Sequence, residues 1–247
     1  MRKFGLIGYP LTHSFSKKYF AEKFGKEAIT DSAYDLYEIE DINQFPQLVS
    51  NIGDELEGLN VTIPHKQSVI QFLDHVEEAA AKIGAVNVIK RDLEGQLTGY
   101  NSDYYGFKNS LIEFLGGGPN RNLKALVLGT GGASKAICQA LSDLKINYLL
   151  VSRNKSERAI AYDQIKDVIK DHKLIINTTP LGTYPKTDTF PALPYSLMDD
   201  TYYLYDLTYN PEITTFMKKG KEFGAHVING LPMLIGQAEK AWKIWNS

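Results

Sequence analysis

A glycine-rich turn constrains the fold of this chain of 247 residues more than any other feature. Gly129, Gly131 and Gly132 follow the apolar run 125–128, which is predicted as a buried strand, and they precede a stretch with the apolar spacing of a helix. Such a turn lets backbone amides approach a pyrophosphate, whose charge the helix dipole stabilises. An ordinary tight turn would use the same glycines, so it is their position between strand and helix that favours nucleotide binding.

Strand-like and helix-like runs alternate along the chain, a pattern typical of α/β domains with mostly parallel sheets. In the first part we expect strands at 3–7, 34–39, 59–62, 87–90 and 96–100, the last two joined as a hairpin, and helices at 14–24 and 76–83. In the second part we expect strands at 124–128, 148–151, 174–176 and 203–207, and helices at 102–115, 133–144, 212–223 and 231–245.

These elements predict an α/β chain with two domains. Residues 1–101 form the first domain, and 102–230 form the second, a Rossmann-like dinucleotide-binding unit. The closing segment 231–247 has apolar residues at helical spacing and is expected to pack back onto the first domain, which would then be discontinuous.

Charge and composition exclude several classes of partner. The net charge of −2, with scattered lysines and arginines, offers no footprint for nucleic acid or an anionic membrane. The N-terminal apolar run is broken by Gly5, Gly8 and Pro10, and no transmembrane stretch follows. A single cysteine, Cys138, and the lack of a Cys/His cluster with ligand spacing favour a reducing cytoplasm and no metal.

The residues after the next strand indicate which dinucleotide binds. An NAD-binding fold places an acidic residue there for the ribose 2′-hydroxyl, whereas this chain has Ser152, Arg153 and Asn154. Cations at this position favour the 2′-phosphate of NADP, since a guanidinium grips phosphate and stacks on adenine. The alternative is that Arg153 is a solvated loop charge. Ser134 replaces the third glycine of the usual fingerprint, so the turn is a variant.

A lysine and an aspartate form the candidate acid–base pair. Hydride transfer to a carbonyl requires a proton, which the ammonium of Lys66 would donate, while Asp103 would orient that ammonium and accept from a substrate hydroxyl. Asn60 and Thr62, on the strand that leads into the turn with Lys66, are expected to project nearby. A structural ion pair between two loops would use the same two charges.

Further polar residues are candidates for ligand binding. For each of them taken alone, a structural role is the simpler interpretation. Ser14 and Ser16 flank the start of the first helix, where a hydroxyl caps the helix. His13 and His65 lack a partner in the sequence and are expected to be structural. The others are turn or core polar groups, namely Asn87, Tyr209 and Gln237.

Taken in order, eight segments resemble the shikimate dehydrogenase family nearly from end to end. They are 14–16, 58–66, 84–87, 99–107, 129–136, 177–182, 209–211 and 230–238. The resemblance implies an N-terminal α/β substrate domain and a Rossmann-like NADP-binding domain. It implies NADPH-dependent reduction of 3-dehydroshikimate to shikimate in aromatic amino-acid biosynthesis, by a cytoplasmic monomer or homodimer.

The resemblance also implies roles for individual residues. Lys66 would be the acid–base catalyst. The substrate would be bound by Ser14, Ser16, Asn60, Thr62, Lys66, Asn87, Asp103, Tyr209 and Gln237. The cofactor would be bound by Gly129, Thr130, Gly131, Gly132, Ala133, Ser152, Arg153, Asn154, Thr178, Leu207, Gly230 and Met233, with Glu78 a weaker member.

Two departures from the family pattern concern the adenosine side of the cofactor. The family usually has Asn-Arg-Thr where this chain has Ser152, Arg153 and Asn154, and the helix that follows is unusually short before 159–165. Two other functions stay open. One is a dehydrogenase of quinate, or of both acids, because a site tolerates an added hydroxyl with modest discrimination. The other is a non-catalytic module that senses NADP and a ligand.

Overall fold

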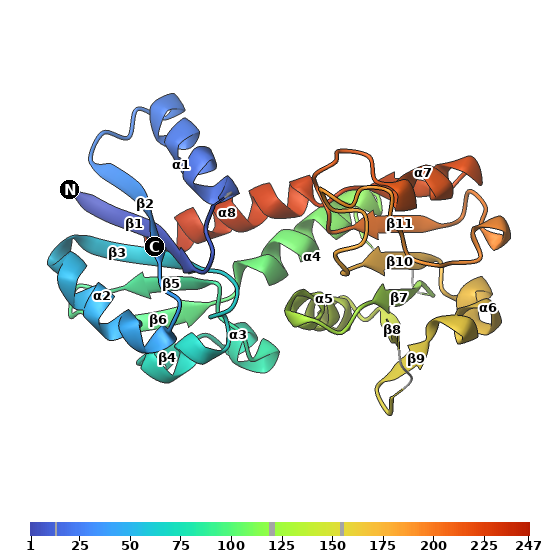
Figure 1. Cartoon of the computed structure of the whole chain (residues 1–247), viewed down its shortest axis with the longest axis horizontal. Helices are drawn as coiled ribbons and strands as arrows, with labels where there is room; N and C mark the ends of the chain where they lie inside the picture. The colour runs from blue at the N-terminus through green and yellow to red at the C-terminus, as the bar shows by residue number, and fades with distance from the viewer. Residues whose placement is uncertain (13, 119–121, 154–155) are drawn as a thin grey trace. The chain divides into compact units, whose positions relative to one another are not determined.

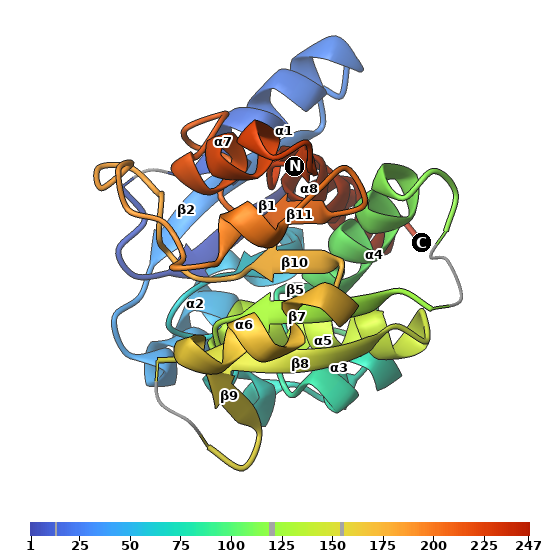
Figure 2. The same ribbon diagram turned by 90° about the vertical axis from the view of Figure 1, so that its right-hand side faces the viewer.

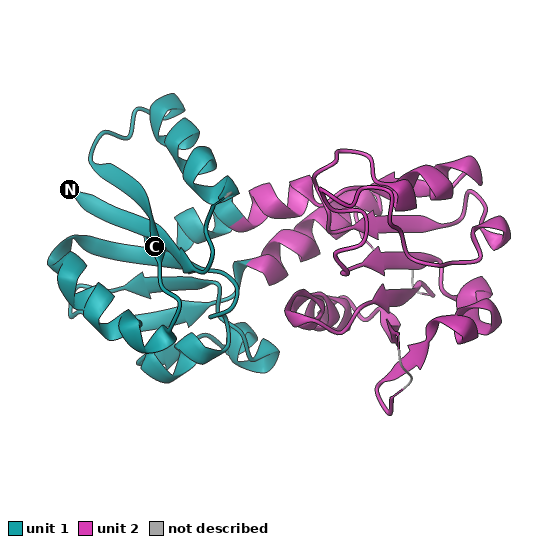
Figure 3. Ribbon diagram, viewed as in Figure 1, with its two compact units in different colours: residues 1–102, 238–247 teal, residues 103–237 magenta. Residues whose placement is uncertain are grey.

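The computed structural model describes residues 1–12, 14–118, 122–153 and 156–247, and the chain divides into two compact units (Figure 3). Unit 1 comprises Met1–Ser102 and Ala238–Ser247, and unit 2 comprises Asp103–Gln237. The last helix, α8 (Leu231–Trp245), therefore contributes residues to both units. The prediction of an α/β fold is confirmed (Figure 1).

Unit 1 is built on a mixed sheet of six strands in the order β2-β1-β3-β5-β6-β4. The central strand β1 (Arg2–Gly8) pairs in parallel with β2 (Ser32–Glu38) and β3 (Leu56–Val61). The predicted hairpin is confirmed as the antiparallel pair β5 (Val88–Arg91) and β6 (Leu97–Tyr100). The helices are α1 (Phe15–Lys26), α2 (Phe45–Ile52) and α3 (Glu78–Ile83).

The core of unit 1 is aromatic, and the end of α8 is part of it. Phe4, Phe20 and Trp245 are almost fully buried and pack together. The indole nitrogen of Trp245 donates to the carbonyl of Ile89 at 2.9 Å. A Cβ on Gly58 would lie 2.2 Å from the Trp245 ring, so this strand position requires glycine.

Unit 2 is a parallel sheet with the strand order β12-β11-β10-β7-β8-β9, which is the order of a Rossmann fold. Figure 2 faces this unit and shows β11, β10, β7 and β8 side by side. The strands are β7 (Lys124–Leu128), β8 (Asn147–Ser152), β9 (Ala159–Ala161), β10 (Leu174–Asn177), β11 (Tyr203–Asp206) and β12 (His226–Ile228). The helices other than α8 are α4 (Ser102–Phe114), α5 (Gly132–Asp143), α6 (Ile165–Val168) and α7 (Thr215–Glu222).

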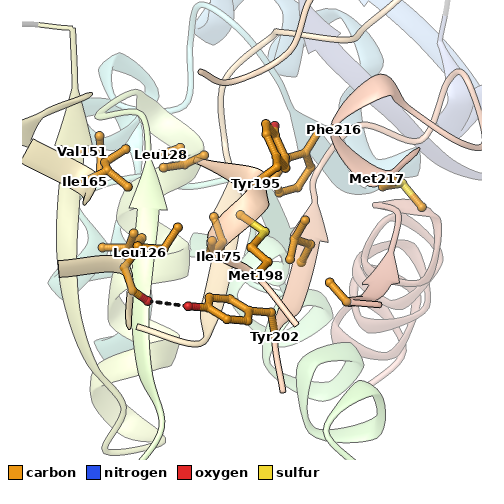
Figure 4. Packing of buried hydrophobic residues seen from close by; sticks show 13 residues of the cluster. Leu126, Leu128, Val151, Ile165, Ile175, Tyr195, Met198, Tyr202, Phe216 and Met217 are labelled. Carbon is orange, nitrogen blue, oxygen red and sulfur yellow. Dashed lines mark hydrogen bonds between the residues drawn. The ribbon is translucent and has the colours of Figure 1, made fainter. Parts of the chain in front are cut away.

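A hydrophobic cluster fills the space beside this sheet (Figure 4). Leu126, Ile175 and Phe216 are fully buried within it. The hydroxyl of Tyr202, at the edge of the cluster, donates to the carbonyl of Ile169 at 3.1 Å, so this buried phenol keeps a partner. The cluster fixes the strands whose carboxyl ends carry the cavity described below.

Two predicted helices begin later than the sequence pattern indicated. The helix predicted at 76–83 is wrong at its start, because His75–Val76 forms the strand β4 and the Glu77 carboxylate caps α3 by accepting from the amides of Ala79 and Ala80. The helix predicted at 212–223 begins only at Thr215, because the Thr214 hydroxyl caps it and donates to the buried Asp206. Helix α2 was not predicted.

Helices α4 and α8 cross at a pair of glycines in unit 2. A Cβ on Gly106 would lie 2.5 Å from the carbonyl oxygen of Met233, and one on Gly236 would lie 3.3 Å from the Cα of Gly106. Neither position leaves ordinary room for a larger residue. Among the described residues, none of the helices combines the length and apolar character needed to span a membrane.

Candidate active site

The glycine turn of unit 2 opens into a cavity of about 560 Å³ at the carboxyl edge of the parallel sheet. Gly129 has φ +106°, a conformation that favours glycine, and its amide donates to the carbonyl of Val151 at 2.8 Å. A Cβ at this position would lie 2.8 Å from the Thr178 hydroxyl oxygen. The predicted residues Gly129, Thr130 and Gly131 line the cavity, with Ser152, Arg153 and Thr178.

The N-terminus of α5 completes the chemistry of this cavity. Gly131 is its N-cap, and no side chain of the described residues caps it. An ideal Cβ on Gly131 or Gly132 would meet nothing within 4 Å, so open space lies beside these two residues at the start of the helix. Amides at a helix N-terminus beside a glycine turn fit a pyrophosphate, and the residues present therefore suit a dinucleotide.

The adenosine side of such a dinucleotide would meet a cation. Arg153 is exposed at the end of β8, and none of the described residues that line the cavity is acidic. This wall suits the 2′-phosphate of NADP better than a free 2′-hydroxyl. Asn154, the other residue predicted here, lies outside the described residues.

A buried polar network holds the neighbouring edge of the sheet. Asp206 is fully buried, and its carboxylate accepts from Asn177 Nδ2 at 3.0 Å, from the amide of Thr208 at 3.0 Å and from the Thr214 hydroxyl at 2.7 Å. Burial raises the pKa of Asp206, and these donors oppose the rise. The network fixes the chain on either side of it, including Thr178 after β10.

Two predicted cofactor residues, Leu207 after β11 and Gly230 after β12, lie close together. The amide of Leu207 donates to the carbonyl of Asn177 at 3.0 Å, and a Cβ on Gly230 would lie 2.0 Å from the Leu207 carbonyl oxygen. Gly230 is therefore required for the close approach of these two segments. Met233 follows in the first turn of α8 and is largely buried.

In unit 1 the structure joins two predicted substrate residues, Asn60 and Asn87, in one chain of hydrogen bonds. The Tyr34 phenol donates to Asn60 Oδ1 at 2.7 Å. Asn60 Nδ2 donates to the carbonyl of Asn87 at 3.3 Å, and Asn87 Oδ1 accepts from the amide of Ser102 at 2.6 Å. Asn60, Asn87 and Ser102 are buried, so this network also has a structural role.

The network ends next to the predicted acid–base residues. Ser102 immediately precedes Asp103, which is half-buried in the first turn of α4. Lys66 is half-buried in the turn after β3, and its carbonyl accepts from the amide of Val86 at 2.7 Å, one residue before Asn87. Both backbone positions are thus fixed against the network. The acid–base role of the two side chains stays a prediction.

The remaining predicted residues have individual surroundings. Ser14 caps α1 by accepting from the amide of Lys17 at 3.3 Å, and Thr62 lies half-buried directly after β3. Tyr209 is exposed, whereas Gln237 on α8 is buried. Glu78, predicted as a weaker cofactor residue, lies at the start of α3 in unit 1 and is paired with Lys82 at 2.7 Å.

His65 has the structural role expected of it: it is buried and its Nε2 lies 2.7 Å from the carbonyl oxygen of Ile39. His13 lies outside the described residues. The described residues hold no group of three or more His, Cys, Asp or Glu side chains placed to bind a metal.

Sequence reasoning missed three aromatic residues. Tyr162 and Phe190 line the cavity of unit 2, and the Tyr34 phenol donates to Asn60 in unit 1. No motif marks them. The only sequence signal was the short stretch that follows β8. Residues 159–161 after it form the strand β9, whose pairing with β8 brings Tyr162 to the carboxyl edge of the sheet.

Comparison with known proteins identifies the family. Residues 6–89 match the family model described as the shikimate dehydrogenase substrate binding domain. The chain is 40% identical to a Clostridium beijerinckii protein named shikimate dehydrogenase (NADP(+)), over 99% of this chain and 92% of that protein. The chain belongs to the shikimate dehydrogenase family. This confirms the resemblance found in the sequence.

Solved structures of the shikimate dehydrogenase family and of a related enzyme have the same fold. A chorismate mutase/shikimate 5-dehydrogenase fusion protein from Clostridium acetobutylicum is 36% identical with a TM-score of 0.87, and the match covers 100% of this chain and 91% of that one. A quinate dehydrogenase from Corynebacterium glutamicum in complex with NAD is 25% identical with a TM-score of 0.86, covering 99% of this chain and 93% of that one.

Proposed function

We propose that this chain reduces 3-dehydroshikimate to shikimate with NADPH, as a step of aromatic amino-acid biosynthesis. The observation that carries the proposal is the coexistence of two features. Unit 2 has a cavity at the glycine turn, which Arg153 lines and which has no acidic residue among the described lining residues. The chain also matches, over nearly its full length, a protein named for this activity and for NADP.

NADPH, when bound, supplies the hydride for the carbonyl carbon of the substrate. The amides of the glycine turn and the N-terminus of α5 bind its pyrophosphate, and Arg153 binds its 2′-phosphate. Further cofactor contacts in this proposal come from Ser152, Thr178, Leu207, Gly230 and Met233.

Lys66 supplies the proton that the reduction requires. Its ammonium donates to the carbonyl oxygen as negative charge develops there, and the neutral amine is then reprotonated from solvent. Asp103 orients the ammonium and accepts a hydrogen bond from a substrate hydroxyl. Hydrogen bonds hold the backbone carbonyl of Lys66 and the residue that precedes Asp103.

The polar network of unit 1 supports recognition of a polyhydroxylated acid. Asn60 and Asn87 use part of their hydrogen-bonding capacity inside the network, and each amide retains a further donor or acceptor site. In this proposal they bind substrate hydroxyls, together with Ser14, Ser16, Thr62, Tyr209 and Gln237. The proposal further includes a cytoplasmic enzyme that acts as a monomer or homodimer.

Initial rates of cofactor reduction by the purified chain test the proposal. Shikimate and quinate are each paired with NADP+ and NAD+. We expect the highest kcat/KM with shikimate and NADP+. Faster turnover of quinate with NAD+ would instead favour the activity named for the Corynebacterium glutamicum enzyme. A folded chain that binds NADP+ and shikimate without turnover in any pair would be a sensor.

A further inference from the structure

The register of β8 and β9 places two cavity residues side by side. The strands are parallel, and Ser152 lies opposite Ala161. The next residues, Arg153 and Tyr162, therefore leave the sheet at the same edge, and both line the cavity that holds the glycine turn. Burial raises the pKa of Tyr162, and the nearby charge of the Arg153 guanidinium opposes that rise.

Tyr162 is held firmly on its inner side. Its half-buried ring packs against the hydrophobic cluster of unit 2, whose members include the fully buried Val151 and Ile165. A ring fixed in this way loses little conformational freedom when a ligand binds. Its outer side belongs to a cavity with the apolar lining residues Val151, Leu181 and Phe190.

A flat aromatic ring next to a guanidinium is suited to a purine base that carries a neighbouring phosphate. We propose that Tyr162 binds the adenine ring of the dinucleotide through its aromatic face, while Arg153 binds the 2′-phosphate. This division of roles rests on the proposed use of NADP. It makes Tyr162 a determinant of affinity for the nucleotide and Arg153 a determinant of the choice between NADP and NAD.

Calorimetric binding of NADP+, NAD+ and 2′,5′-ADP to the full chain tests this division. Tyr162→Ala is expected to weaken all three ligands by a similar factor of about ten, since the lost contact is with the shared base. Tyr162→Phe keeps the ring and is expected to bind as wild type. Arg153→Ala is expected to weaken NADP+ and 2′,5′-ADP but not NAD+.

Two further variants separate binding from folding. Tyr148→Ala removes another half-buried tyrosine of unit 2 that does not line the cavity, so it is expected to leave all three affinities unchanged. Tyr162→Leu keeps apolar volume against the hydrophobic cluster but lacks the ring, and it is expected to lose affinity as Tyr162→Ala does. Circular dichroism checks that each variant is folded.

The inference is overturned if Tyr162→Leu binds all three ligands as wild type, or if Tyr162→Phe loses affinity only for the two ligands with a 2′-phosphate. It is also overturned if wild type binds none of them. A wild-type chain that shows the expected binding pattern but does not oxidise shikimate contradicts the proposed reaction and leaves the role of Tyr162 intact.

Discussion

The two units arrange their polar groups in different ways. In unit 2 the cavity is shaped by the backbone, through the positive φ of Gly129 and the uncapped N-terminus of α5. In unit 1 the polar groups are side chains that bind one another, from Tyr34 through Asn60 to Asn87. A glycine turn at a helix N-terminus indicates anion binding, whereas a buried network of amide side chains can simply stabilise the fold. The sequence therefore indicates the function of the unit 2 turn more readily than that of the unit 1 network.

The largest expected effect concerns the lysine of unit 1. Lys66→Ala should lower kcat by a factor of about 10²–10⁴ and change KM little, because proton donation matters chiefly in the transition state. Steady-state kinetics with shikimate and NADP+ measure both constants. Lys18→Ala, which removes a highly exposed lysine of the same unit, is the control. An unchanged kcat for Lys66→Ala would exclude Lys66 as the proton donor.

The amide network of unit 1 should be needed for stability as well as for activity. Asn87→Ala removes the hydrogen bonds that Asn87 makes with the buried amide and hydroxyl of Ser102, at a cost of about 1–3 kcal/mol in the free energy of unfolding. Urea denaturation measures this loss. Tyr34→Phe, which removes only the phenol that donates to Asn60, should cost less, since Asn60 keeps its bond to Asn87. Equal losses of unfolding free energy in the two variants would contradict this ranking.

Two substitutions in the glycine turn of unit 2 should distinguish the effect of backbone strain from the effect on ligand binding. Gly129→Ala introduces a Cβ at φ +106° and 2.8 Å from the Thr178 hydroxyl, so it should lower stability by about 1–3 kcal/mol and weaken NADP+ binding as well. Gly131 has φ −78° and open space at its Cβ position, but it is the N-cap of α5, where alanine is less favourable than glycine, so Gly131→Ala should weaken NADP+ binding with a smaller loss of stability than Gly129→Ala. Thermal unfolding and calorimetry measure the two quantities. An equal loss of stability in the two variants would contradict the distinction.

The smallest effect concerns an exposed cluster of unit 1 outside the network. Lys3 and the N-terminal amine of Met1 lower the pKa of Glu55 from its usual 4.5 to about 2. A depressed carboxylate pKa gives stability that is present above the unfolded value and is lost as the pH falls from 4.5 towards 2. Glu55→Gln should therefore flatten the acid side of the stability curve slightly at low salt and leave kcat unchanged. Denaturation between these pH values measures it.

The sequence predicted the α/β fold, the glycine turn and the family, because each depends on local periodicity or on ordered motifs such as 58–66. It failed where a contact distant in the chain decides the outcome. The start of α7 depends on the bond between Thr214 and Asp206, and the strand β4 depends on its pairing with β6. The links from Tyr34 to Asn60 and from Asn87 to Ser102 likewise join residues that no motif brings together.

The pairing of β8 with β9 also affects how cofactor preference can change during evolution. Arg153 and Tyr162 are neighbours through strand register, so the loop between the strands can lengthen without separating them. A single-residue insertion within β9 would instead shift Tyr162 by one position relative to Arg153. Variation in the length of that loop should therefore be tolerated, whereas a switch between NADP and NAD requires a substitution at Arg153.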